Sequence, residues 1–231
     1  MNPAERRRLL EAFTRDDEDI DALSDVLYLN KVRVYEDTLA ELADLYDYEV
    51  EDLTLSQEVL DALRDEADLR AEQMTGTYNG DLAGFIDAIP DDITYEHSVE
   101  ATELWATDRD EARSELVGIT EAYSAHADAT VAFFVNNGIE VEFDFGGHGD
   151  DHPQCVVCEA LVRSNPHPAE RVVEVGTPHI QCRQKWHAVI EADDLPDELV
   201  LGQGAPAGIL GNESLVQRAG GHTEAAEGLN G

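Results

Sequence analysis

Residues 126–145 read HADATVAFFVNNGIEVEFDF, and this stretch decides the expected fold. Before residue 137 the apolar residues recur at helical spacing, on a face that also includes positions 112, 116, 119 and 123. From Ile139 onward apolar and acidic residues alternate, which is the period of a strand with one buried face. Gly138, between the two patterns, can adopt the left-handed conformation that ends a helix. The stretch therefore predicts a long helix from about residue 108 to 137 and a strand over 139–145.

The residues before this stretch predict further helices. A short helix is expected over residues 3–14, and a long one follows whose apolar residues step by four and three: Tyr28, Val32, Tyr35, Leu39, Leu42 and Tyr46. The segment Thr54-Leu-Ser-Gln57 is a capping-box candidate that would open a third helix, with apolar residues Val59, Leu60, Leu63 and Ala67. Residues 75–84, with glycine at 76, 80 and 84, predict a break, and residues 90–92 predict a second.

The residues after this stretch predict a smaller unit. Residues 146–151 read as a loop, and 172–175 and 186–190 as two short strands. From Asp193 glycine becomes frequent and large apolar groups sparse. We therefore predict the α+β class in three parts: a helical region 1–107, an α+β unit 108–192 stabilised by zinc, and an irregular tail 193–231. The tail is expected to be flexible or bound to a partner.

The composition is extremely acidic. In 231 residues there are 51 Asp and Glu against 15 Lys and Arg, a formal charge of −36, and only Lys31 and Lys185 are lysines. This composition is typical of proteins from the cytoplasm of extreme halophiles. Salt there shortens the range of repulsion between the acidic side chains to a few ångströms. It argues against a surface that tracks nucleic-acid phosphates. Neither an apolar run of membrane-spanning length nor a secretory leader is present, so we expect synthesis in a cytoplasm.

Three cysteines lie in two short pairs, Cys155-Val-Val-Cys158 and His179-Ile-Gln-Cys182, with the spacing C-x2-C-x20-H-x2-C. Three thiolates and an imidazole suit a tetrahedral Zn²⁺ site, and four protein ligands would make it structural, not catalytic. Other candidates for the fourth ligand are His167, His187 and His152. The alternative is that the three cysteines stay reduced and pack as small apolar side chains without a metal.

The order, spacing and element type of these features resemble the Mu F-like head morphogenesis family, the minor head proteins of tailed bacteriophages. The family signature is a helix with a Thr-Glu element, a glycine-led strand, a C-x2-C pair and a Pro-His-x-x-Cys-Arg segment. Its counterparts here are Thr120-Glu121, the strand after Gly138, Cys155 to Cys158, and Pro178 to Arg183. The resemblance covers roughly residues 108–192.

This resemblance implies a structural component of the virion and not an enzyme. Such a protein would lie in the head near the portal vertex, act in head assembly, and take part in DNA packaging or delivery. Its partners would be the portal protein, the major capsid protein and, indirectly, the packaged DNA, with no membrane and no small-molecule substrate. Together with the acidic composition, the resemblance implies a tailed virus of a halophilic archaeon, whose proteins are made in the host cytoplasm.

The chain departs from the family pattern at two positions. Gln184 stands where the family often has a second cysteine, so the four-ligand site depends on His179. Ile119 stands where the family often has an arginine before Thr-Glu, so any salt bridge from that arginine is missing. Glu121 itself is either a solvated helical glutamate or a buried one near the zinc unit, bonded to backbone donors or to Arg183.

Two other functions remain as alternatives. One is a zinc-containing protein–protein adaptor of a halophilic archaeon. The other is a metal-dependent hydrolase whose ligands would come from the loop residues His148, Asp150, Asp151 and His152. The sequence has no H-E-x-x-H element or similar hydrolase pattern, so the structural function is preferred.

Overall fold

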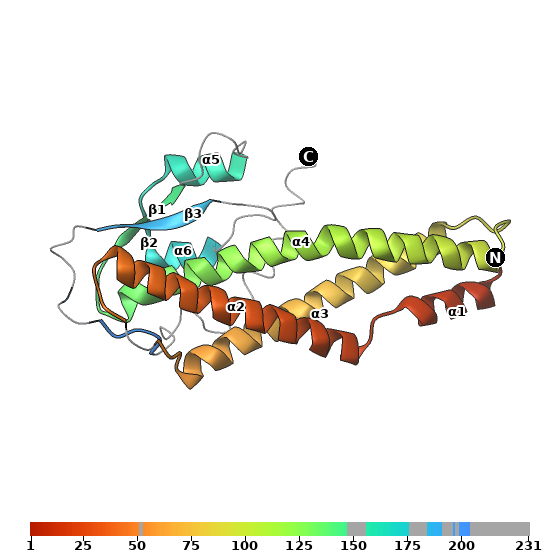
Figure 1. Ribbon diagram of the computed structural model, residues 1–231. Coiled ribbons are helices and arrows are strands. Elements are labelled where there is room, and N and C mark those ends of the chain that lie inside the picture. The colour runs from red at the N-terminus through yellow and green to blue at the C-terminus, as the bar shows by residue number, and fades with distance from the viewer. Residues whose placement is uncertain (51–52, 147–155, 176–183, 191–195, 197–198, 204–231) are drawn as a thin grey trace.

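The computed structural model is a bundle of long helices with a small sheet at one end (Figure 1). It describes residues 1–50, 53–146, 156–175, 184–190, 196 and 199–203, and at residues 111–116 only the course of the helix. The sheet lies at the end of the bundle far from Met1. The prediction of a mainly helical chain with a small β part is thereby confirmed.

Four helices form the N-terminal part: α1 (Pro3–Phe13), α2 (Asp17–Leu45), α3 (Gln57–Ala88) and α4 (Tyr95–Val135). Each begins after a polar residue whose side chain accepts a hydrogen bond from a backbone amide of the first turn: Asn2, Asp16, Ser56 and Thr94. An acidic residue also lies in the first turn of every one, where it complements the helix dipole. No helix in the described ranges is long and apolar enough to span a membrane.

The start of α3 and the start of α4 differ from the prediction. The cap of α3 is Ser56, whose Oγ accepts from the amide of Val59 at 3.3 Å, and not Thr54. Helix α4 begins at Tyr95, because Pro90 ends α3 and Thr94 caps the next helix. The break at 90–92 is confirmed, as is the end of α4 beside Asn137 and Gly138, where Gly138 has φ +68°.

The predicted break at residues 75–84 is wrong, because α3 continues to Ala88. Gly76, Gly80 and Gly84 all lie on its solvent-exposed side. The other side buries Thr75, Tyr78, Leu82 and Ile86. A glycine costs a helix about 1 kcal/mol relative to alanine, and tertiary burial of the apolar side offsets that cost.

The C-terminal elements are β1 (Glu142–Gly146), α5 (Val156–Arg163), β2 (His167–Pro168), α6 (Ala169–Val175) and β3 (Lys185–Val189). The sheet order is β2-β1-β3, and both pairings are antiparallel. In the register Phe145 pairs with Trp186, and both side chains are buried. The predicted strand 139–145 is confirmed over residues 142–145, and the predicted strand 186–190 over residues 186–189.

The predicted strand at 172–175 is wrong, because these residues belong to α6. Val172 and Val173 are adjacent and both buried, which a strand with one buried face does not allow. Helix α6 packs against α4, and this contact overrides the preference of valine for strands.

The bundle and the sheet share one main core. It contains Tyr35 and Leu39 of α2, Leu63 of α3, and Phe134 of α4. From the sheet and its helices it takes Phe143, Phe145, Cys158, Leu161, Val172, Val173 and Trp186. A second core lies around Leu9 where α1 covers the far ends of α3 and α4. The predicted boundary at 107–108 falls inside α4.

Candidate functional site

Of the four predicted zinc ligands, only Cys158 lies within the described residues. It sits in the first turn of α5 and is 3% exposed, in the main core. Cys155, His179 and Cys182 lie outside the described residues, as do Arg183 and the loop residues His148, Asp150, Asp151 and His152. In the sequence Cys155 directly precedes α5, and His179 and Cys182 fall between α6 and β3.

The donor chemistry of the predicted set suits zinc, because soft thiolates and imidazole are the ligands of structural zinc sites. Within the described residues no group of three or more His, Cys, Asp or Glu side chains is placed to hold a metal ion. Three of the four ligands fall outside those residues, so the zinc site remains a prediction.

Two of the alternative ligands have structural contacts of their own. His167 of β2 is buried, and its Nε2–H donates to the carbonyl oxygen of Leu161 at 2.9 Å. Its ring meets the ring of Trp186 edge to face, with centroids 5.3 Å apart. His187 of β3 is exposed, and its Nε2 lies 3.2 Å from the carbonyl oxygen of Gly146. His167 thus ties α5 to the sheet.

A second candidate, which the sequence interpretation missed, is a buried ionic cluster between α2, α3 and α4. We define it as Lys31, Glu66, Arg70 and Glu121. Lys31 Nζ lies 2.7 Å from Glu121 Oε2 and 3.1 Å from Glu66 Oε1. Arg70 Nε lies 3.1 Å from Glu121 Oε1. The Lys31 side chain is 0% exposed, and those of Glu66 and Glu121 are 3% and 4% exposed. One glutamate of α4 therefore holds a cation from each of the other two long helices.

The charge of Lys31 is maintained by its neighbours. Burial alone lowers the pKa of the Lys31 amine, but the carboxylates of Glu121 and Glu66, with that of Asp128, outweigh burial and raise it. Tyr35, one turn further along α2, is also buried, and burial together with Asp128 raises the pKa of its phenol. The Lys31 amine thus stays protonated at neutral pH.

The cluster is suited to holding helices, because the side chains of Lys31, Glu66 and Glu121 are closed off from solvent and only that of Arg70 is partly exposed. Glu121, for which the sequence left two interpretations, is the buried kind, and its cations are Lys31 and Arg70. Removing one partner of such a buried pair leaves an uncompensated charge, which costs about 3–5 kcal/mol. The cluster therefore fixes how α4 lies against α2 and α3.

The sequence does contain a signal for this cluster. Lys31 lies on the predicted apolar stripe of α2, three residues after Tyr28 and four before Tyr35. It is also one of only two lysines in the chain. A rare lysine on an apolar helix face indicates a buried charge with a partner, although its partners on other helices cannot be deduced from spacing.

A third feature is His126 of α4, which is near β3. Burial first, and then the charges of Lys185 and His187, lower the pKa of its imidazole to about 4. The Thr130 hydroxyl, one turn on, donates to the His126 carbonyl at 2.8 Å. His126 is therefore neutral where α4 meets the sheet.

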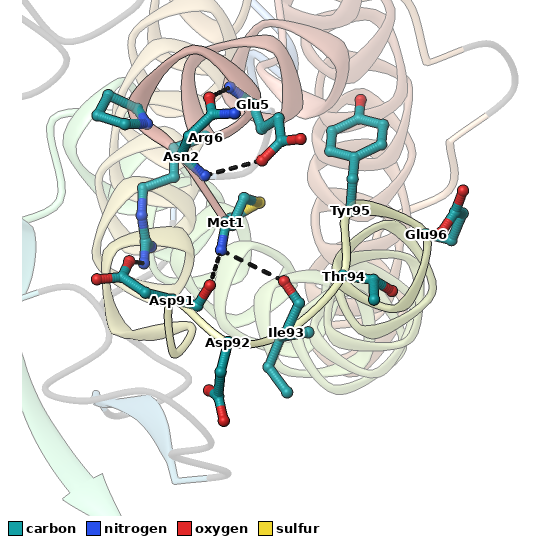
Figure 2. Close-up of a pocket in the computed structure, with 11 residues that line it drawn as sticks. Met1, Asn2, Glu5, Arg6, Asp91, Asp92, Ile93, Thr94, Tyr95 and Glu96 are labelled. Carbon is teal, nitrogen blue, oxygen red and sulfur yellow. Dashed lines mark hydrogen bonds and ion pairs between the residues drawn. The ribbon is translucent and has the colours of Figure 1, made fainter.

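A surface hollow lies at the other end of the bundle, between the starts of α1 and α4 (Figure 2). The amine of Met1 donates to the carbonyl oxygens of Asp91 and Ile93. Arg6 binds the carbonyl of Ile89 and, at 2.8 Å, the carboxylate of Asp91. The hydrogen bond from Arg6 and then its charge lower the pKa of the Asp91 carboxyl. These groups satisfy one another and fasten α1 to the α3–α4 turn.

Comparisons of the chain with protein families, with curated proteins and with solved structures gave no match. The resemblance to the head morphogenesis family therefore rests on the sequence elements quoted above. The structure adds the surroundings of those elements that fall within its described residues.

Proposed function

We propose that this chain is a structural minor head protein of a tailed virus of a halophilic archaeon. It acts near the portal vertex in head assembly, with the portal protein and the major capsid protein as partners. DNA packaging or delivery is a further role, in which contact with the DNA is indirect. Zn²⁺ held by Cys155, Cys158, His179 and Cys182 is part of this proposal, as a structural ion without a catalytic role.

The observation that carries the proposal is the order of the elements around the sheet. A long helix with Thr120-Glu121 is followed by a glycine-led strand, then by a helix that begins inside the C-x2-C pair. The Pro178-to-Arg183 segment comes directly before Gln184 and β3. The family signature has the same order of helix, strand, cysteine pair and final histidine–cysteine segment.

The buried ionic cluster supports a structural function for Glu121, the acidic residue of the Thr-Glu element. In the bundle this residue holds Lys31 and Arg70 and is closed to solvent. A buried pair is screened by salt much less than a surface pair. Such a cluster therefore suits a protein that must keep its shape in a salt-loaded cytoplasm.

The proposal is tested by deleting the gene from the virus genome and examining the particles. We expect the loss of infectious particles, with heads that are absent, unfilled or unable to deliver DNA, and recovery when the wild-type gene is supplied in trans. As a matched pair, Glu121→Gln should fail to restore titre, while Glu159→Gln, at an exposed helical pair, should restore it. Normal titre and normal filled heads without the gene would overturn the proposal.

A further inference from the structure

Residues 199–203, which we call the strap, lie between the start of α3 and the end of α4. Leu199 and Leu201 pack against the main core, while Val200 between them is 51% exposed. This alternation is that of a strand at the edge of a protein, with one side chain in and the next out. The strap belongs to no helix or strand, so its position depends on its contacts with two other segments.

On one side the strap contacts the segment that opens α3. The amide of Ser56, the cap residue of α3, donates to the carbonyl oxygen of Gly202. Gly202 is buried and has φ +67°, a conformation that favours glycine. A Cβ atom there would lie 2.6 Å from the carbonyl oxygen of Thr54. The backbone of the strap therefore lies against residues 54–56 at a distance that only glycine permits.

On the other side the strap contacts the turn between α4 and β1. Asn137 brackets Val200: its Oδ1 accepts from the Val200 amide at 2.6 Å, and its Nδ2 donates to the Val200 carbonyl at 3.2 Å. Asn136 Nδ2 donates to the carbonyl oxygen of Gln203 at 2.9 Å. The strap thus joins the start of α3 to the end of α4 without belonging to either.

We propose that the strap is a latch, which opens and closes as one unit while the helices stay folded. It is held by the four hydrogen bonds named above, it has no regular secondary structure of its own, and its residue Val200 is exposed. Segments of this kind open at free energies well below that of global unfolding. Opening uncovers the part of the main core beneath Leu199 and Leu201 and releases Asn136 and Asn137. Opening of the latch therefore changes the contacts at the sheet end of the bundle, and this inference holds whether or not the proposed function does.

Amide hydrogen exchange of the full-length protein, followed by NMR in molar salt, tests the latch. The Ser56 and Val200 amides should have similar protection factors. Both should exchange on the order of 100-fold faster than the amide of Leu63 inside α3. Their exchange should also be nearly insensitive to low concentrations of denaturant, because little surface is exposed when only the strap opens. Exchange of Ser56 and Val200 at the Leu63 rate would overturn the proposal, because the strap would then open only with the whole bundle.

Two glycine variants of the full chain distinguish a clash in the strap from the backbone strain that any side chain causes at a positive φ. Gly202 and Gly138 have nearly the same positive φ, +67° and +68°, but a Cβ at Gly138 would meet nothing within 4 Å. Gly202→Ala should accelerate Ser56 exchange by on the order of 10-fold or more with Leu63 unchanged. Gly138→Ala strains the backbone beside Asn137 but brings no clash with the strap, so it should accelerate Ser56 exchange less than Gly202→Ala does. Equal acceleration of Ser56 in both variants, relative to Leu63, would refute the latch.

Discussion

Replacing Lys31 with methionine should be among the most damaging single changes in this protein. Methionine keeps most of the side-chain volume but removes the charge, so Glu66 and Glu121 lose the ammonium group that lies 3.1 and 2.7 Å from them. The carboxylates stay buried, and Arg70, which contacts only the Oε1 side of Glu121, cannot replace the missing contact. The variant therefore tests whether the cluster fixes the packing of the three long helices.

The magnitude follows from the burial of the pair. Lys31 is fully buried, so its removal should lower the free energy of unfolding by the about 3–5 kcal/mol that is typical of a broken buried pair. In a chain of this size 1 kcal/mol shifts the unfolding midpoint by about 2–4 °C. The midpoint of Lys31→Met should thus fall by about 6–20 °C.

Thermal unfolding followed by far-UV circular dichroism in molar KCl measures this loss. The matched control is Arg163→Met, which breaks a helical pair with Glu159 whose side chains are 78% and 43% exposed. An exposed pair contributes roughly 0–1 kcal/mol, so the control should unfold near the wild-type midpoint. A Lys31→Met midpoint as close to wild type as the control, or a loss that vanishes as salt is raised, would refute the reasoning.

Three further predictions concern the metal, the salt and the pH. Elemental analysis should find about one zinc per chain, and Cys158→Ala should lose it, while Leu161→Ala, on the same helix and also buried, should lower stability but keep the zinc. With a formal charge of −36, dilution from molar salt to about 0.1 M should lower the unfolding midpoint, and an unchanged midpoint would contradict the halophilic interpretation. His126 has a native pKa of about 4 and an unfolded pKa of about 6.5, so the unfolded state binds more protons between these values. Stability should therefore fall as pH drops from about 6.5 to 4, and His126→Gln, unfolded by denaturant at each pH, should show a shallower fall.

The sequence predicts those parts of the fold that depend on local chemistry. The end of α4 at Val135, shortly before Gly138, and the alternation of β1 follow from conformational preference and period. The two main errors have a tertiary cause. Glycines on the exposed side of α3 do not break a helix whose other side is buried, and the valines of α6 are helical because they pack on α4.

The candidate site shows a similar limit. The position of Lys31 on an apolar stripe is visible in the sequence, but Glu66 and Glu121 are 35 and 90 residues away from it. No spacing rule links residues on three separate helices, so the cluster emerges only once the helices are packed. Glu121 could be singled out only through its place in the Thr-Glu element, and its partners Lys31 and Arg70 could not.

The central claim, a structural function in the head of a tailed virus, is tested most directly by quantitative mass spectrometry of purified particles separated into heads and tails. The account predicts that this chain is a reproducible component of the head fraction, at low copy number relative to the major capsid protein, and that it cross-links to the portal protein. Its absence from purified heads, together with abundance in uninfected host cells, would contradict the account.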